Sequence, residues 1–171
     1  ISSGKGTLQI VTPIFKSETL NTTIERVELT GVSQPKAGEA LKTDVTVSEN
    51  AGYAVESMTW KKEGSEDAAT GNAEYGTTYT AKVVLTAENG YEFGTIDKSK
   101  VSISNGAGIE NLDANVSGGK LTITWTYTTA DKTISEVNLK GVCQPTAGEA
   151  LKTEVTVPEN AGYAVDGKIT W

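Results

Sequence analysis

The sequence predicts an all-β protein made of two-sheet antiparallel β-sandwiches that follow one another in tandem. Strand-forming Thr and Val recur along the chain and alternate with polar residues, and no window of useful length shows the period of a helix. Short clusters of Gly, Pro and Asn separate the alternating runs, as turns do between strands. The chain also repeats itself at a spacing of 110 residues, which is the size of a whole β-sandwich domain rather than of a solenoid repeat.

The repeat is close to identical over its best-matching part. Ile24–Val55 aligns without a gap with Ile134–Val165, and the two stretches differ at only 8 of 32 positions. Further on, the Met-Thr-Trp at 58–60 corresponds to the Ile-Thr-Trp at 169–171. A second copy of the same unit therefore begins near residue 131.

The first residues of the chain resemble the end of a unit. Gly6–Ile10 reads GTLQI, and Gly119–Ile123 reads GKLTI. We therefore expect residues 1–22 to hold the closing strand of a preceding repeat, residues 23–130 a complete repeat, and residues 131–171 the first half of a following repeat.

Three strands are expected in the first half of the complete repeat. The first contains Val27 and Leu29, the second contains Val45 and Val47, and the third covers residues 55–60 and ends in Trp60. Residues 31–39 are rich in Gly and Pro and are expected to form a turn or a crossing between sheets.

The second half contains the clearest alternation. Apolar side chains occupy every second position of Tyr79–Ala87 and again of Leu121–Tyr127, where Thr fills most of the positions between. A short strand is expected at Val101–Ile103. Turns are expected at the two Asn-Gly pairs, 89–90 and 105–106.

Two stretches of the complete repeat resemble a known family. Gly76–Phe93 reads GTTYTAKVVLTAENGYEF, and Ala51–Trp60 precedes it; both are similar to bacterial immunoglobulin-like repeats of Gram-positive, clostridial-type cell-surface proteins. Those repeats usually carry Ser-Pro after the Trp, whereas Lys61 and Lys62 follow here, a difference expected to change only a loop. The resemblance implies immunoglobulin-like β-sandwiches, secretion and a spacer, adhesive or glycan-contacting role. It implies no catalytic residue.

Composition removes several classes of function. The net charge of −7 argues against nucleic acid and anionic membranes as partners, because both bind clusters of Lys and Arg. Histidine, the commonest general base and zinc ligand, is absent. A single cysteine, Cys143, excludes a disulfide within the chain, and no apolar run is long enough to span a membrane. We therefore expect no enzyme activity, no catalytic residues, no cofactor and no metal.

Two groups of residues have side chains that could carry chemistry. Four carboxylates lie close together in one expected loop: Glu63, Glu66, Asp67 and Glu74. They suggest either a solvated surface or an acidic site for glycoside hydrolysis or for calcium. The alternating spacing of a calcium-binding loop is absent. Cys143 replaces Ser33 of the complete repeat and is interpreted as an incidental thiol.

The tryptophans leave two interpretations open. Trp60, its repeat equivalent Trp171, and Trp125 all lie at positions expected to fill the core of a sandwich. The alternative is that an exposed ring stacks on a sugar, for which Trp125 and the turn residue Tyr75 are the candidates.

The predicted function is that of a non-catalytic spacer, stalk or adhesive module displayed outside a bacterial cell, at its surface. The alternative is a carbohydrate-binding accessory module of a large glycan-active surface enzyme. Cell-wall or host glycans, or proteins, are the expected partners. We also expect self-association, in which Gly6–Phe15 of one copy docks on the C-terminal half-repeat of another, because an unfinished sheet exposes unpaired edges.

Overall fold

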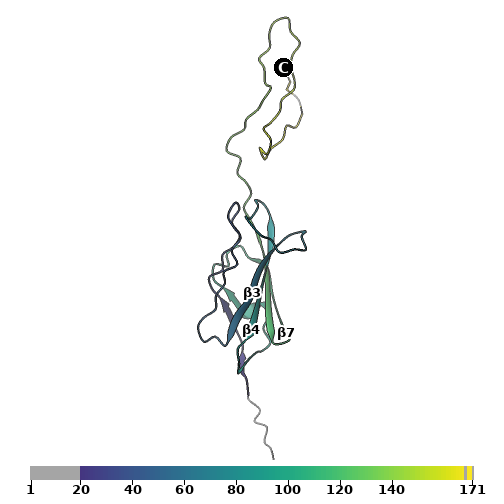
Figure 1. Ribbon diagram of the computed structural model, residues 1–171. Helices are drawn as coiled ribbons and strands as arrows, with labels where there is room; N and C mark the ends of the chain where they lie inside the picture. The colour runs from purple at the N-terminus through teal and green to yellow at the C-terminus, as the bar shows by residue number, and fades with distance from the viewer. Residues whose placement is uncertain (1–19, 168, 171) are drawn as a thin grey trace, which may run out of the picture.

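The computed structural model describes residues 20–167, 169 and 170, and confirms the all-β class (Figure 1). Strand accounts for 37% of the described residues and helix for 2%. All the named elements lie in residues 20–130, which we call the complete unit. In chain order they are β1 (Thr22–Ile24), β2 (Val27–Leu29), β3 (Tyr53–Lys62), β4 (Thr78–Ala87), β5 (Tyr91–Phe93), the 3₁₀ turn η1 (Lys98–Lys100), β6 (Val101–Ile103), β7 (Glu110–Ser117) and β8 (Lys120–Thr128).

A four-stranded antiparallel sheet forms one layer of the complete unit, in the order β3-β4-β8-β7. The two central strands, β4 and β8, are those with the clearest alternation in the sequence, and they pair over nine residues from Thr78↔Thr128 to Thr86↔Lys120. The alternation buries Ala81 and Val83 on one face, while Lys82 is exposed on the other. The expected strands at 79–87 and 121–127 are therefore confirmed.

The opposite layer differs from the antiparallel arrangement that was expected. Its pairs, β1 with β5 and β2 with β6, are parallel and three residues long. Parallel neighbours need long connections, and the intervening chain supplies them by crossing to the four-stranded sheet and back. The expected strand at Val45 and Val47 is wrong, because only Thr46 pairs, through reciprocal backbone bonds of 2.8 Å with Thr30.

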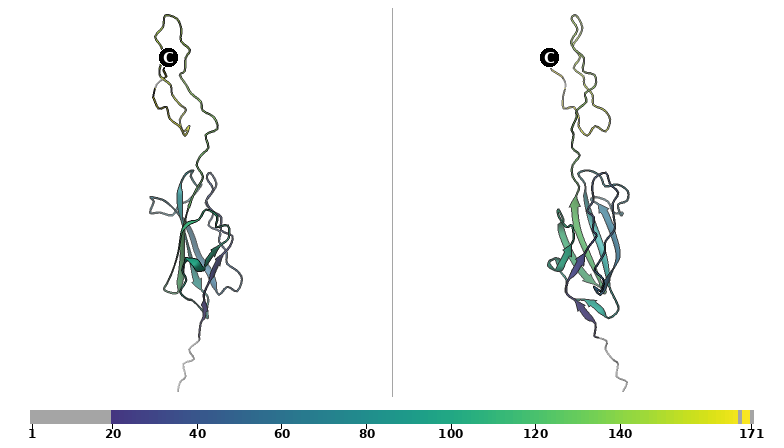
Figure 2. Two further views of the ribbon diagram at one scale, coloured as in Figure 1. Left: turned by 180° about the vertical axis from the view of Figure 1, so that it is seen from behind. Right: turned by 90° about the vertical axis from the view of Figure 1, so that its left-hand side faces the viewer.

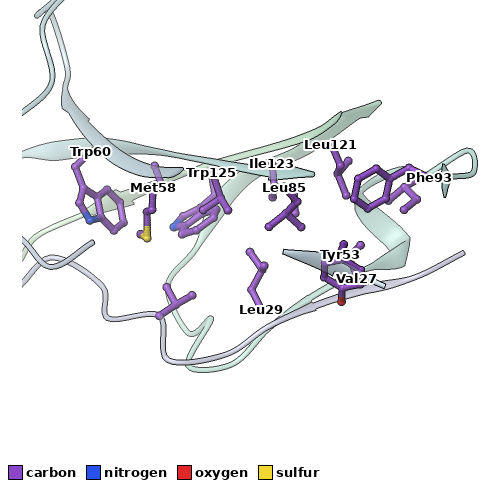
Figure 3. Close-up of a cluster of buried hydrophobic side chains, with 14 of the residues drawn as sticks. Val27, Leu29, Tyr53, Met58, Trp60, Leu85, Phe93, Leu121, Ile123 and Trp125 are labelled. Atoms are coloured by element: carbon purple, nitrogen blue, oxygen red, sulfur yellow. The ribbon is translucent and has the colours of Figure 1, made fainter. Parts of the chain in front are cut away.

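The core lies between these two layers, which is consistent with a β-sandwich (Figure 3). Leu85, Leu121 and Ile123 approach it from the four-stranded sheet, and Val27 and Leu29 approach it from the opposite layer. All five side chains are at most 2% exposed. Burial of this kind contributes about 1.5–3 kcal/mol for each large apolar side chain.

The C-terminal segment, residues 131–170, extends from the complete unit at the end where β8 finishes (Figures 1 and 2). Its described residues form no strand; one isolated antiparallel bridge joins Lys140 to Thr156. That bridge is the repeat equivalent of Thr30 with Thr46. The closing strand expected at Gly6–Phe15 lies outside the described residues.

Candidate functional site

The two described tryptophans are core residues. Trp60 is 1% exposed and Trp125 is 0% exposed, and their rings meet edge to face with centroids 5.9 Å apart. Trp60 Nε1 donates to the carbonyl of Lys42 at 2.7 Å, and Trp125 Nε1 donates to Gln34 Oε1 at 3.2 Å. The candidate role of Trp125 as a sugar platform is therefore corrected, because no face of this ring reaches solvent in the folded unit.

Gln34 is a residue whose role the sequence did not indicate. Its Oε1 accepts the bond from Trp125, 91 positions away, while its Nε2 is buried without a hydrogen-bond partner among the described residues. The repeat keeps this residue as Gln144. Because 24 of the 32 aligned positions are repeated, repetition does not distinguish Gln34 from its neighbours.

Tyr75 keeps the exposure that a contact residue needs. Its side chain is 51% exposed, and it lies in the loop between β3 and β4. A Cβ built on Gly38 would lie 3.5 Å from the Tyr75 hydroxyl, so the ring lies beside the 36–39 turn. The Tyr75 ring is therefore exposed, whereas Trp60 and Trp125 belong to the core.

The carboxylates of the 63–74 loop do not converge on a shared site. Lys61 Nζ donates to Glu66 at 2.9 Å, and Lys62 Nζ donates to Glu74 at 2.6 Å. The hydrogen bond from Lys61 lowers the pKa of Glu66, and the hydrogen bond to Glu74 raises the pKa of Lys62. No group of three Cys, Asp or Glu residues suited to a metal ion occurs among the described residues.

A set of apolar side chains is exposed on the C-terminal segment. Val137 is 59% exposed and Leu139 is 52% exposed, whereas their equivalents Val27 and Leu29 are 2% and 0% exposed. We call the whole set the exposed apolar set: Ile134, Val137, Leu139, Val142, Leu151. In the complete unit the equivalents of these residues belong to the core or pack against it.

A groove of about 590 Å³ adjoins this set, with Cys143 and Leu151 among its lining residues. Cys143 is exposed, whereas Ser33 at the equivalent position of the complete unit is partly buried. Two of the other lining residues are cationic, Lys140 and Lys152. The thiol is therefore accessible to reagents beside the exposed apolar set.

The junction between the complete unit and the C-terminal segment is anchored by hydrogen bonds. Thr129 is 3% exposed, and its hydroxyl lies 2.6 Å from the Glu74 carbonyl and 3.2 Å from the Thr77 carbonyl. Gly76 N donates to the carbonyl of Ala130 at 3.0 Å. Gly76 has φ +55°, and a Cβ there would lie 2.5 Å from the Asp131 carboxylate, so a side chain would disturb the junction. These contacts fix the direction in which the chain leaves β8.

Comparison with known proteins places the chain in no group: no protein-family model, curated protein or solved structure matches it. Among the described residues, no helix is long and apolar enough to cross a membrane. The class defined by the fold is that of all-β proteins with a four-stranded antiparallel sheet.

Proposed function

We propose that this chain is a non-catalytic spacer or stalk module of a secreted or surface-displayed bacterial protein, in which immunoglobulin-like repeats follow one another along one axis. One observation carries the proposal: the chain enters the complete unit at one end and leaves it at the other, directly into residues that repeat the start of the same unit with few changes (Figure 1). Repetition of this path lengthens a molecule without requiring a new contact.

The anchored junction supports this role. Thr129 and Ala130 are bonded to the 74–77 turn, so only residues 131–133 separate those anchors from Ile134, where the repeated sequence resumes. A connection of three residues spans at most about 10 Å. Successive units joined in this way are held end to end, as a stalk requires.

The function is tested by stretching single molecules that contain several copies of residues 20–133. Independent units predict a series of equal unfolding steps, each releasing about 110 residues and therefore about 360–400 Å of chain. A single unfolding event for the whole array would contradict the proposal. Gly76→Val, which places a branched side chain against the Asp131 carboxylate, is expected to loosen the junction and leave the step length unchanged.

The carbohydrate-binding alternative retains one candidate residue, Tyr75. It is tested by co-sedimentation of residues 20–133 with insoluble polysaccharides and cell walls. Binding that is lost in Tyr75→Ala and kept in Tyr91→Ala, which removes another exposed tyrosine at the start of β5, would favour this alternative. Equal sedimentation with and without polysaccharide would support the spacer.

A further inference from the structure

We propose that a groove beside β2 binds an acidic sugar, a uronic acid whose carboxylate pairs with Arg26. The groove has a volume of about 430 Å³, which is within the range of small-ligand sites, and it lies between β2, the η1–β6 segment and the turn that precedes β3. A unit that lengthens a molecule is free to hold a ligand on its side, so this inference goes beyond the spacer proposal and does not depend on it.

Arg26 supplies an uncommitted positive charge to the groove. It is the only arginine of the sequence, it is exposed, and its guanidinium makes no hydrogen bond or ion pair with another described residue. The other cation of the lining, Lys100, is already engaged: its Nζ donates to the Thr95 carbonyl at 2.6 Å and lies 3.7 Å from the Glu25 carboxylate. A planar guanidinium binds a carboxylate through two parallel hydrogen bonds, so Arg26 is the group expected to hold an acidic ligand.

Hydroxyl groups accompany this charge in the lining. Ser48 and Ser102 line the groove, and neither side chain bonds to another described residue. Tyr53 is 6% exposed, and its hydroxyl accepts a hydrogen bond from Glu28 N at 3.0 Å. The proton of that hydroxyl has no acceptor among the residues that the structure describes. Because each hydroxyl donates one hydrogen bond and accepts others, this lining matches the hydroxyls of a sugar ring.

One carboxylate of the lining, Glu28, narrows the class of ligand. Arg26 and Glu28 flank the buried Val27, so both side chains leave the chain on its outer side. A carboxylate repels a compact dianion such as phosphate, whereas it accepts hydrogen bonds from sugar hydroxyls. A ligand with one carboxylate and several hydroxyls therefore fits the groove better than an inorganic anion.

The repeated stretch, residues 134–165, keeps the frame of this groove and changes its chemistry. The aligned stretch contains six of the groove residues, and three of the eight differences between the copies fall on them. The replaced residues are polar, whereas the three that are kept are apolar or aromatic. The replacements are Arg26 by Glu136, Glu28 by Asn138 and Ser48 by Pro158. A uronate should therefore bind the complete unit, and a groove lined by the replacement residues should repel it.

The groove is separate from Tyr75, the exposed ring of the carbohydrate-binding alternative. Tyr53 pairs with Ala87, where β4 ends, whereas Tyr75 lies three residues before Thr78, where β4 begins. A strand of ten residues is about 33 Å long, so the two places are at opposite ends of the sheet. Variants at Arg26 and at Tyr75 therefore test different sites.

The sole arginine provides a direct test, because its Nε–H gives a single signal in the nitrogen–proton NMR spectrum of the 171-residue protein. D-glucuronate should shift this signal in a saturable way. D-glucose lacks the carboxylate and acetate lacks the hydroxyls, so both should bind at least about tenfold more weakly. Equal binding of acetate or phosphate, or a signal that glucuronate does not move, would overturn the proposal.

Charge reversal identifies the group that holds the ligand. Arg26→Glu introduces the residue of the repeated stretch and should weaken glucuronate binding by at least about tenfold, followed at the Ser102 amide signal. Arg26→Lys keeps the charge but not the planar fork, and should lose part of the affinity. Unfolding curves of the variants confirm that each remains folded.

Lys82→Glu is the matched control, because Lys82 is exposed on the outer face of the four-stranded sheet and the substitution changes the net charge by the same amount. This variant, like Tyr75→Ala, should bind glucuronate as the original protein does. Equal losses in Lys82→Glu and Arg26→Glu would overturn the proposal, because they would show general attraction between charges instead of a site at Arg26.

Discussion

Residues 24–53 and residues 134–163 have nearly the same sequence but different structures. In both, the glycines of the first turn have positive φ, 70° at Gly31 and 82° at Gly141, and the asparagines before the last turn match as well, 61° at Asn50 and 58° at Asn160. The reciprocal backbone bonds of 2.8–2.9 Å between Thr30 and Thr46 also recur between Lys140 and Thr156. The turns are therefore encoded locally.

The strands and the buried core are not encoded locally. β1, β2 and the start of β3 form only in the complete unit, where β4, β5 and β6 supply their partners. The equivalent residues of the C-terminal segment, whose described part has no such partners, form no strand. A turn depends on the φ preferences of a few residues, whereas a strand depends on a neighbour that can be far away in sequence.

The largest effect is expected when a buried core side chain of the complete unit is shortened. Leu29→Ala should lower the free energy of unfolding of the complete unit by about 2–5 kcal/mol, because it leaves a cavity at a fully buried position. Leu139→Ala, at the exposed equivalent, should change it by less than about 0.5 kcal/mol. Urea unfolding followed by the fluorescence of Trp60 and Trp125 measures both. Equal losses would mean that the C-terminal segment packs as tightly as the complete unit.

A second pair of variants concerns a close approach of an aromatic ring to the backbone. A Cβ on Gly52 would lie 2.4 Å from Tyr91 Cδ1, and Gly52 has φ +79°. Gly52→Ala should therefore cost about 1–3 kcal/mol, from backbone strain and from displacement of the ring. Gly162→Ala, with nothing within 4 Å, should leave the unfolding of the complete unit unchanged.

A double-mutant cycle with Tyr91→Ala separates the contribution of the Tyr91 ring from that of backbone strain at Gly52. The cost of Gly52→Ala should fall when the ring is absent, and thermal unfolding gives the required values. A cost that stays the same in the Tyr91→Ala background would assign the whole effect to the backbone.

A smaller effect is expected at Tyr53, the first residue of β3, and at its repeat equivalent Tyr163. Tyr53 accepts a bond from Glu28 N at 3.0 Å, and Tyr163 accepts one from Asn138 N at 2.6 Å. Tyr53→Phe should cost about 0.5–1.5 kcal/mol of unfolding free energy, because it removes the acceptor and keeps the buried ring. Tyr163→Phe should leave the free energy of unfolding of the complete unit unchanged. Hydrogen exchange at the Glu28 and Asn138 amides would show whether both bonds protect their donors.

The smallest effect depends on pH and is confined to the complete unit. The hydrogen bond from Lys120, with a further one from Thr86, lowers the pKa of Glu56 below its ordinary value of 4.5. This interaction therefore stabilises the fold above that value and is lost as the pH falls through the lowered pKa. Glu56→Gln should be slightly less stable than the original protein at pH 7 and equally stable in strong acid.

Glu88→Gln is the control for this titration, because the Glu88 side chain makes no hydrogen bond or ion pair with another described residue. Unfolding curves at a series of pH values compare the three proteins. A difference between Glu56→Gln and the original protein that persists unchanged below pH 3 would mean that charge is not the cause.

The parts of the fold that were predicted share a strong local signal. Alternation identified β4 and β8 and the burial of their core face. β7 was missed because Asn and Asp fill its outward positions and its inward residues, such as Ala114, are only partly buried. β1 and β5 were missed because three residues are too few to show a period.

The contacts that could not be predicted join residues far apart in sequence. The bond from Trp125 to Gln34 spans 91 positions, and no local pattern specifies it. The same holds for the parallel pairing of β2 with β6, which are separated by more than 70 residues. Val45 and Val47 alternate as a strand would, yet only Thr46 finds a backbone partner, so alternation alone is not sufficient.

The anchored exit from β8 has a mechanical consequence. Tension applied through the junction at Thr129 enters β8, which is hydrogen-bonded along both sides, to β4 and to β7. At the opposite end of the complete unit the chain enters through β1, so the load runs parallel to β8 and shears its ladders instead of breaking them one bond at a time (Figure 1). In shear the bonds of a strand share the load. We therefore expect each unit to resist pulling along its axis far better than pulling across the edge of the sheet.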